Sequence, residues 1–304
     1  MFGAGCVATP QYAVRGTPVP DESTSSVAIE RQISAVQAKD FEQHGARLIG
    51  AHERLQGFEV QPLIDRISRV TERSYLHYRA YLYEDKEPNA AALADGRIYL
   101  STGMLSYLKG RGGREDELAF VVGHELAHTV AQHLVKRYYH LQEQQVWLSL
   151  AAVGAAAATR GASTGIQQAS KLAVDLIQQV TFNGYSQEQE LEADQLGIRY
   201  VQRAGFAPSA ALDLLEDFQR FEGAPVGSFL RTHPYSGLRR AYLQQYLEET
   251  GGMARSRAPV GGAAPAQTNA AAKRRDLQRI QQMYPKDSVS WRNLQRQIDE
   301  LPSG

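Results

Sequence analysis

The sequence of 304 residues contains a single cysteine, Cys6, which excludes a disulfide within these residues and a zinc site built on several cysteines. It also lacks an apolar run of the roughly 20 residues that a membrane-spanning helix requires. The nearest stretch, residues 146–159, is mostly alanine and is interpreted as a packed helix or a flexible cover, with membrane contact as the alternative.

Neither sign of charge is in excess, because Lys+Arg and Asp+Glu are both 33 and the formal net charge is zero. A global field that draws a protein onto nucleic acid or an anionic membrane is therefore not expected, and we predict no nucleic-acid partner. The hydrophobic content of 43% is enough to bury a substantial core in one main domain with extensions.

Composition divides the chain into four parts. Residues 1–26 are rich in small and turn-forming residues and are predicted to be a tether, followed by the folded domain at 27–250. Residues 251–272 are dominated by Gly, Ala and Pro and should form a flexible linker, because they offer little apolar surface to bury. Residues 273–304 are predicted to be a short helical tail, either solvated or docked on a partner.

Periodicity within the domain predicts an α+β fold, mostly helical with a small β-sheet. Apolar residues at helical spacing predict two N-terminal helices, at about 27–55 and 60–75. Residues 78–83 and 97–101 are short and rich in aromatic or branched side chains, which is typical of strands.

The most informative motif is the pentapeptide His124-Glu125-Leu126-Ala127-His128. A helix is predicted here, because residues 115–117 place negative charge in a first turn and apolar residues recur at helical spacing from 118 to 134. Two histidines four apart on a helix face the same way and can bind one zinc ion, while Glu125 can deprotonate a metal-bound water. The alternative is a pair of ordinary, partly buried helix histidines beside a glutamate.

A third ligand is expected from a second helix at residues 186–204. Ser186 and Gln189 stand in capping-box relation at its start. Glu190 and Asp194 are four apart, so that one helix face presents both carboxylates to the first helix. Glu190 is predicted to bind zinc and Asp194 to accept the free ring N–H of a ligand histidine. An ordinary acidic helix face is the alternative.

The remaining acidic and histidine residues are predicted to take no part in this site. Glu188 and Glu192 should be solvated on other faces of the second helix. Surface or packing roles are expected for the five histidines without matching partners, which are His44, His52, His77, His133 and His140.

The order of these motifs resembles peptidase family M48. The pentapeptide at 124–128 precedes Glu-x-x-Ala-Asp at 190–194, with the stretch 89–103 upstream and Thr-His-Pro at 232–234 downstream, followed by Arg239. The resemblance covers about residues 60–245. It implies a gluzincin-type domain in which one zinc ion per chain is held by the ligands His124, His128 and Glu190.

Among the subgroups, the chain is most similar to the periplasmic BepA-like and LoiP-like lipoprotein peptidases. The resemblance implies envelope quality control, with unfolded or misassembled proteins as substrates and envelope assembly machinery as a partner. Cys6 follows small residues as in the end of a bacterial lipoprotein signal, so lipidation and anchoring to the outer membrane are expected. An ordinary free thiol is the alternative.

His233 has three interpretations. The resemblance implies a catalytic-site residue that serves as an extra zinc ligand and keeps the resting enzyme latent. It could instead donate a hydrogen bond to the developing oxyanion, or be a turn histidine before Pro234. Arg239 is expected to pair with nearby carboxylates.

These residues together predict a zinc-dependent endopeptidase. Glu125 acts as general base, and residues 97–100 form the strand that borders the cleft and pairs with an extended peptide. The competing hypothesis is a chaperone-like protein that binds misfolded clients with little turnover.

Overall fold

The computed structural model describes residues 12–156, 180, 184–221, 232–234, 236–252, 295, 298 and 299; for residues 145–156 and 221 it describes the backbone alone. Cys6 lies outside the described residues, as do nearly all of the predicted linker and tail. The apolar stretch at 146–159 is helical as far as residue 156, and its last three residues lie outside the described part. No helix within the described ranges has the length and hydropathy needed to cross a bilayer.

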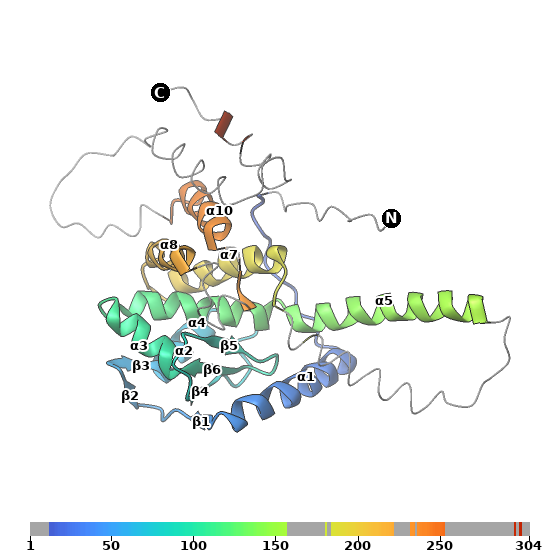
Figure 1. Ribbon diagram of the computed structural model, residues 1–304. Coiled ribbons are helices and arrows are strands. Elements are labelled where there is room, and N and C mark those ends of the chain that lie inside the picture. Colours follow the sequence, from blue (N-terminus) through green and yellow to red (C-terminus); the bar gives the residue numbers. More distant parts are fainter. Residues whose placement is uncertain are drawn as a thin grey trace.

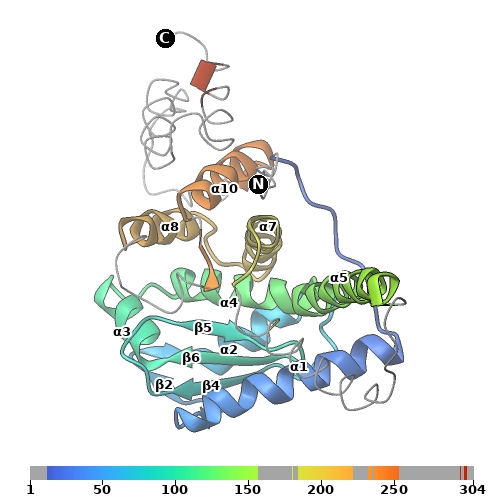
Figure 2. The same cartoon turned by 45° about the vertical axis from the view of Figure 1, so that its right-hand side comes forward.

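The elements follow one another in the order α1 (Thr24–Gln43), β1 (Arg47–Leu48), β2 (Arg54–Leu55), β3 (Phe58–Glu59), α2 (Val60–Ser68), β4 (Arg79–Tyr83), β5 (Ala90–Ala92), β6 (Arg97–Ser101), α3 (Thr102–Gly110), α4 (Glu115–Val130), α5 (His133–Ala156), α7 (Gln187–Arg203), α8 (Ala210–Phe221) and α10 (Ser236–Glu249). They are arranged in layers, with α4 between the small sheet and the helices α7 and α8, which lie side by side, and with α10 beyond these two helices (Figures 1 and 2). The predicted α+β class, mostly helical with a small sheet, is confirmed.

The four-stranded sheet has the order β1-β4-β6-β5. Strands β4 and β6 are parallel, whereas β5 pairs antiparallel with β6. The prediction that residues 97–100 border the cleft was therefore wrong: they lie in β6, which is paired on both sides. The edge strand nearest α4 is β5. Its three alanines have weak strand propensity, and only pairing with β6 makes them a strand.

The first predicted helix was too long. α1 ends at Gln43, and Gly45 follows with a φ of 69°, a left-handed conformation that commonly ends helices. The chain then forms β1 to β3, because apolar residues that fit a helical pattern also fit short strands. The second predicted helix is likewise shorter and ends at Ser68.

Helix α4 is buried on all sides. Every residue from Glu117 to Val130 is shielded from solvent, because the helix is covered by the sheet on one side and by other helices on the other. Helix α7 has the predicted start: Ser186 Oγ accepts a hydrogen bond from Gln189 N–H, and Gln189 Oε1 accepts one from Ser186 N–H.

Helices α4 and α7 touch through a pair of glycines. A Cβ atom on Gly197 would lie 2.8 Å from His124 N and 2.9 Å from Gly123 C, and one on Gly123 would lie 2.9 Å from Val201 Cγ2. The two backbones therefore approach more closely than any other residue pair would allow. This contact places the acidic face of α7 directly over the histidines of α4.

We expect Gly197→Ala to destabilise the fold, because its methyl group would meet backbone atoms that cannot move aside. The expected loss is about 1–3 kcal/mol in the free energy of unfolding. Denaturant unfolding measures it. Gly110→Ala is the matched control, since Gly110 also lies in a helix but a Cβ atom there meets nothing within 4 Å. Equal stability of the two variants would contradict the close contact.

Candidate metal centre

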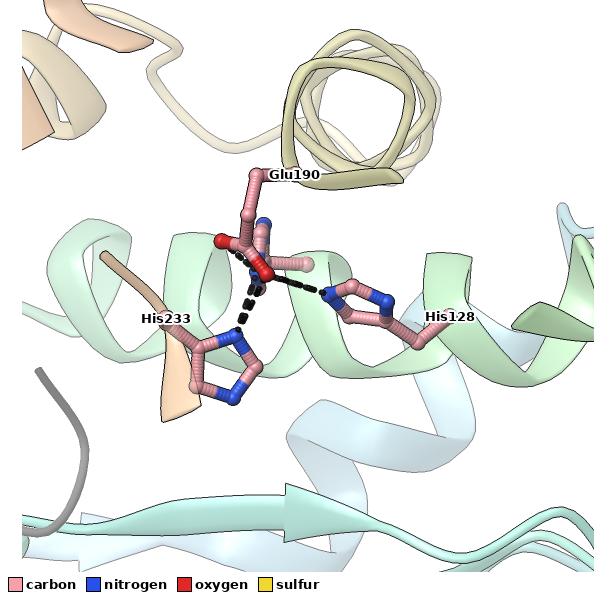
Figure 3. A group of neighbouring side chains, drawn as sticks. His128, Glu190 and His233 are labelled. Carbon is pink, nitrogen blue, oxygen red and sulfur yellow. Dashed lines mark hydrogen bonds and ion pairs between the residues drawn. The ribbon is translucent and has the colours of Figure 1, made fainter. Parts of the chain in front are cut away.

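Four buried side chains converge between α4 and α7 (Figure 3). In Figure 3, His128 projects from α4, Glu190 extends from α7, and His233 comes from the segment between α8 and α10. His124 also belongs to α4. One donor atom from each lies within 4.8 Å of the others. The structure thus brings together the three residues predicted as ligands and His233, which the resemblance implied as an extra ligand.

The spacing of the donor atoms suits a small tetrahedral cation. His124 Nε2 lies 3.0 Å from His128 Nε2 and 3.2 Å from His233 Nδ1. Glu190 Oε1 lies 3.1 Å from His233 Nδ1 and 3.4 Å from His128 Nε2. Four ligands at the roughly 2.0–2.1 Å of zinc–nitrogen and zinc–oxygen bonds stand about 3.3 Å apart in a tetrahedron. The residues present therefore fit a zinc ion.

A buried charge network surrounds this donor set. Asp194 Oδ1 lies 2.9 Å from His124 Nδ1, the ring nitrogen that faces away from the donor cluster. Arg239 donates hydrogen bonds of 2.8 Å to both oxygens of Asp194 and lies 2.8 Å from Glu190 Oε2. The pairing of Arg239 with these carboxylates matches the expectation from sequence.

The network also sets the ionisation of the carboxylates. Burial opposes the charged form of Glu190, but Arg239 and the nearby histidines outweigh it and hold the pKa of Glu190 well below its usual value. The pKa of Asp194 is lowered in the same way, with Arg239 and His124 outweighing burial. Both groups are therefore anionic, as a metal ligand and its supporting acceptor must be.

Glu125 is completely buried beside the cluster. Its Oε2 accepts a 2.9 Å hydrogen bond from the N–H of Ala92 in the edge strand. Its Oε1 accepts no hydrogen bond from the described residues and lies 3.3 Å from His233 Nε2. Burial raises the pKa of Glu125 above its ordinary value, which favours a carboxyl group that both takes up and releases protons.

Backbone hydrogen bonds help to hold the His233 segment over the cluster. The N–H of Tyr185 donates to Thr232 O at 3.1 Å, and Arg239 Nη1 donates to His233 O at 3.2 Å. The Tyr185 ring in turn stacks on His128, with centroids 3.6 Å apart. In this arrangement His233 Nδ1 faces the donor cluster and its Nε2 faces Glu125.

A cleft of about 490 Å³ leads to these residues. One wall is α1, the floor includes the edge strand β5, and the inner end reaches Glu125 and His233. The residues lining it are Gln37, Asp40, Phe41, His44, Tyr83, Asp85, Asn89, Ala90, Ala91, Ala92, Glu125, Leu134, Gly184, Tyr185, Thr232 and His233. An extended chain in this cleft would reach the candidate centre along the free edge of the sheet.

Sequence reasoning missed one pair of residues at the centre. His133, expected at the surface or in packing, is buried with its Nδ1 2.7 Å from His128 Nδ1. Its Nε2 lies 3.3 Å from Glu192 Oε2, so Glu192 is not simply solvated as predicted. No periodic signal marks this pair, because a residue five positions along a continuous helix is rotated by about 140°. Glu188 is exposed and pairs with Arg15.

Comparison with known proteins identifies the family. Residues 55–247 match the family described as Peptidase family M48, so this chain belongs to peptidase family M48, as the motifs predicted. The chain is 27% identical over 227 residues to the mitochondrial metalloendopeptidase OMA1 of Schizosaccharomyces pombe, covering 74% of this chain and 63% of that protein.

Two Escherichia coli proteins are also similar. The metalloprotease LoiP is 27% identical over 176 residues, covering 58% of this chain and 64% of LoiP. The beta-barrel assembly-enhancing protease is 31% identical over 163 residues, covering 52% of this chain and 32% of that protein. The chain thus spans less than two thirds of the length of each of these relatives.

Proposed function

We propose that this chain is a zinc-dependent endopeptidase with His124, His128 and Glu190 as zinc ligands and Glu125 as general base. The observation that carries the proposal is the convergence of buried nitrogen and carboxylate donors at tetrahedral spacing beside a buried glutamate. Imidazole and carboxylate ligands suit zinc. Membership of family M48 supports the same assignment.

A bound zinc ion would polarise the scissile carbonyl and acidify water. Glu125 then takes a proton from the water and passes it to the leaving amine. Its position for this task is set by the hydrogen bond from Ala92 N–H, which fixes one oxygen and leaves the other directed into the site. Asp194 holds the ring of His124 through Nδ1, and Arg239 keeps Asp194 ionised.

The substrate is proposed to bind as an extended chain along β5. The backbone N–H and C=O groups of an antiparallel strand point alternately to its two sides. Because Ala92 N–H donates to Glu125, the backbone groups of Ala90 and Ala92 point away from β6. A peptide can pair with this edge through its main chain, with little selection among side chains. Broad specificity for unfolded or misassembled proteins follows.

His233 is proposed to latch the resting enzyme. Its Nδ1 lies with the other donors, where a catalytic zinc site keeps a position for water or substrate, so it must withdraw before turnover. Its Nε2 faces Glu125, so the same ring also covers the general base.

The proposed setting is the periplasm, with work in envelope quality control beside assembly machinery and with lipidation of Cys6 as an anchor to the outer membrane. Support comes from the similarity to LoiP and to an Escherichia coli protease whose name refers to β-barrel assembly.

Metal analysis combined with a proteolysis assay tests this function. We expect purified protein to contain one zinc ion per chain and to cleave casein. Removing the metal with a chelator should abolish cleavage and lower the melting temperature, because only the folded state presents the four donors. Readdition of zinc should restore both. Protein that binds no zinc, or that cleaves equally well after the metal is removed, would refute the proposal.

A further inference from the structure

The chain leaves the helical conformation directly after α4, the helix that contains the pentapeptide at 124–128. α4 ends at Val130, and Gln132 adopts a φ of 54° before α5 begins at His133. A left-handed conformation is costly for a residue other than glycine and persists only where its surroundings enforce it. The break therefore has a structural cause outside the local sequence.

The side chain of Gln132 provides that cause. It is buried, its Oε1 accepts a hydrogen bond from Asp21 N–H at 2.6 Å, and its Nε2 donates to Asp21 O and Glu30 Oε1 at 2.9 Å each. Glu30 in α1 is itself paired with the buried Arg73. The N-terminal segment and α1 thus fix the conformation of the break.

Because of this break, the side chain of His133 points back toward His128 in α4. In an uninterrupted helix its side chain would point about 140° away from that of His128. Here the two Nδ1 atoms lie 2.7 Å apart, and both rings are buried. Because two lone pairs or two N–H groups would repel at this distance, one of the two nitrogens carries the proton.

We propose that His133 is a positioning residue that fixes the tautomer and orientation of His128 for metal binding. The inference rests on the proposed zinc site. His128 Nε2 faces the donor cluster and needs its lone pair there, so the ring proton is on Nδ1 and is donated to His133 Nδ1. The proton of His133 is then on Nε2, which faces Glu192 Oε2 at 3.3 Å.

The two zinc-binding histidines are thereby supported differently. His124 faces the carboxylate of Asp194 directly, and the charge of that carboxylate is offset by Arg239. His128 faces the neutral imidazole of His133. The carboxylate of Glu192 lies on the far side of the His133 ring, where it is partly exposed to solvent.

Charge balance gives a reason for this difference. Zinc and Arg239 together offset the negative charges of Glu190, Asp194 and Glu125. A further carboxylate directly against His128 would leave the buried centre with uncompensated negative charge, which is costly away from water. His133 accepts the same hydrogen bond without adding charge.

Two substitutions separate this role from simple packing. His133→Leu fills a similar volume but cannot accept a hydrogen bond, whereas the side-chain oxygen of His133→Asn can stand near the position of Nδ1. We expect the leucine variant to bind zinc about 10–100-fold more weakly, as measured by competition with a chelator. The asparagine variant should retain affinity within about threefold of wild type. A packing role alone predicts the reverse order, because leucine packs better than asparagine in an apolar site.

His140→Leu is the matched control, because it removes an exposed histidine from the same helix. Circular dichroism of the metal-free proteins verifies folding. Equal zinc affinity of wild type and His133→Leu, or equal loss in both His133 variants, overturns the inference while leaving the proposed function intact. Wild-type protein that binds no zinc overturns the proposed function itself.

Nitrogen-15 NMR of the zinc-loaded wild type tests the assignment without any substitution. We expect His133 to be the tautomer protonated on Nε2 and His128 to be protonated on Nδ1. A proton on His133 Nδ1 would overturn the inference even if the leucine variant failed to fold.

Discussion

Replacing Glu125 with glutamine is expected to lower the rate of casein cleavage by about 10²–10⁴-fold while zinc remains bound. Glutamine has nearly the same shape, and its side-chain oxygen can still accept the hydrogen bond from Ala92 N–H. It cannot, however, take a proton from water at the pH of the assay. The metal donors are untouched, so metal analysis should give the wild-type zinc content.

Glu115→Gln is the control for this substitution, because Glu115 is an exposed glutamate in the same helix and should tolerate the change without loss of activity. Full proteolysis by Glu125→Gln would refute the assignment of Glu125 as the base. Stoichiometric protection of a misfolded client by wild-type protein, without metal-dependent fragments, would instead favour the chaperone-like alternative.

Local signals in the sequence predicted the two central helices well. The acidic first turn of α4 and the capping box of α7 depend on residues within four positions of one another, so their effects can be read from short segments. The four-part order of motifs then predicted which helices meet, and the structure places Glu190 within 3.4 Å of both histidine rings.

Long-range packing produced the features that the sequence did not reveal. Strand β5 exists because three alanines pair with β6, and the closeness of α4 and α7 depends on Gly123 and Gly197, which lie far apart in the chain. The contact of His133 with His128 depends on a break held by Gln132 and residues of the N-terminal region. Periodicity contains no information about such pairs.

The position of His233 predicts that replacing it changes the rate of casein cleavage. Its ring lies with Nδ1 3.2 Å from His124 Nε2 and with Nε2 3.3 Å from Glu125 Oε1, so we expect it to cover both the water position and the proposed general base. Backbone hydrogen bonds from Tyr185 and Arg239 help to hold this segment in place, and each contributes about 1 kcal/mol.

Replacing His233 with alanine is therefore expected to raise the rate of casein cleavage by about tenfold, which corresponds to about 1.4 kcal/mol of released latch energy. Zinc affinity should fall at the same time, because one donor is lost, so the assay needs zinc in excess. His140→Ala, at an exposed site, controls for loss of a histidine. A role of His233 in stabilising the oxyanion predicts the opposite result, a fall of about 10²–10³-fold, since a preorganised donor would be lost. An unchanged or reduced rate at saturating zinc would thus rule out the latch.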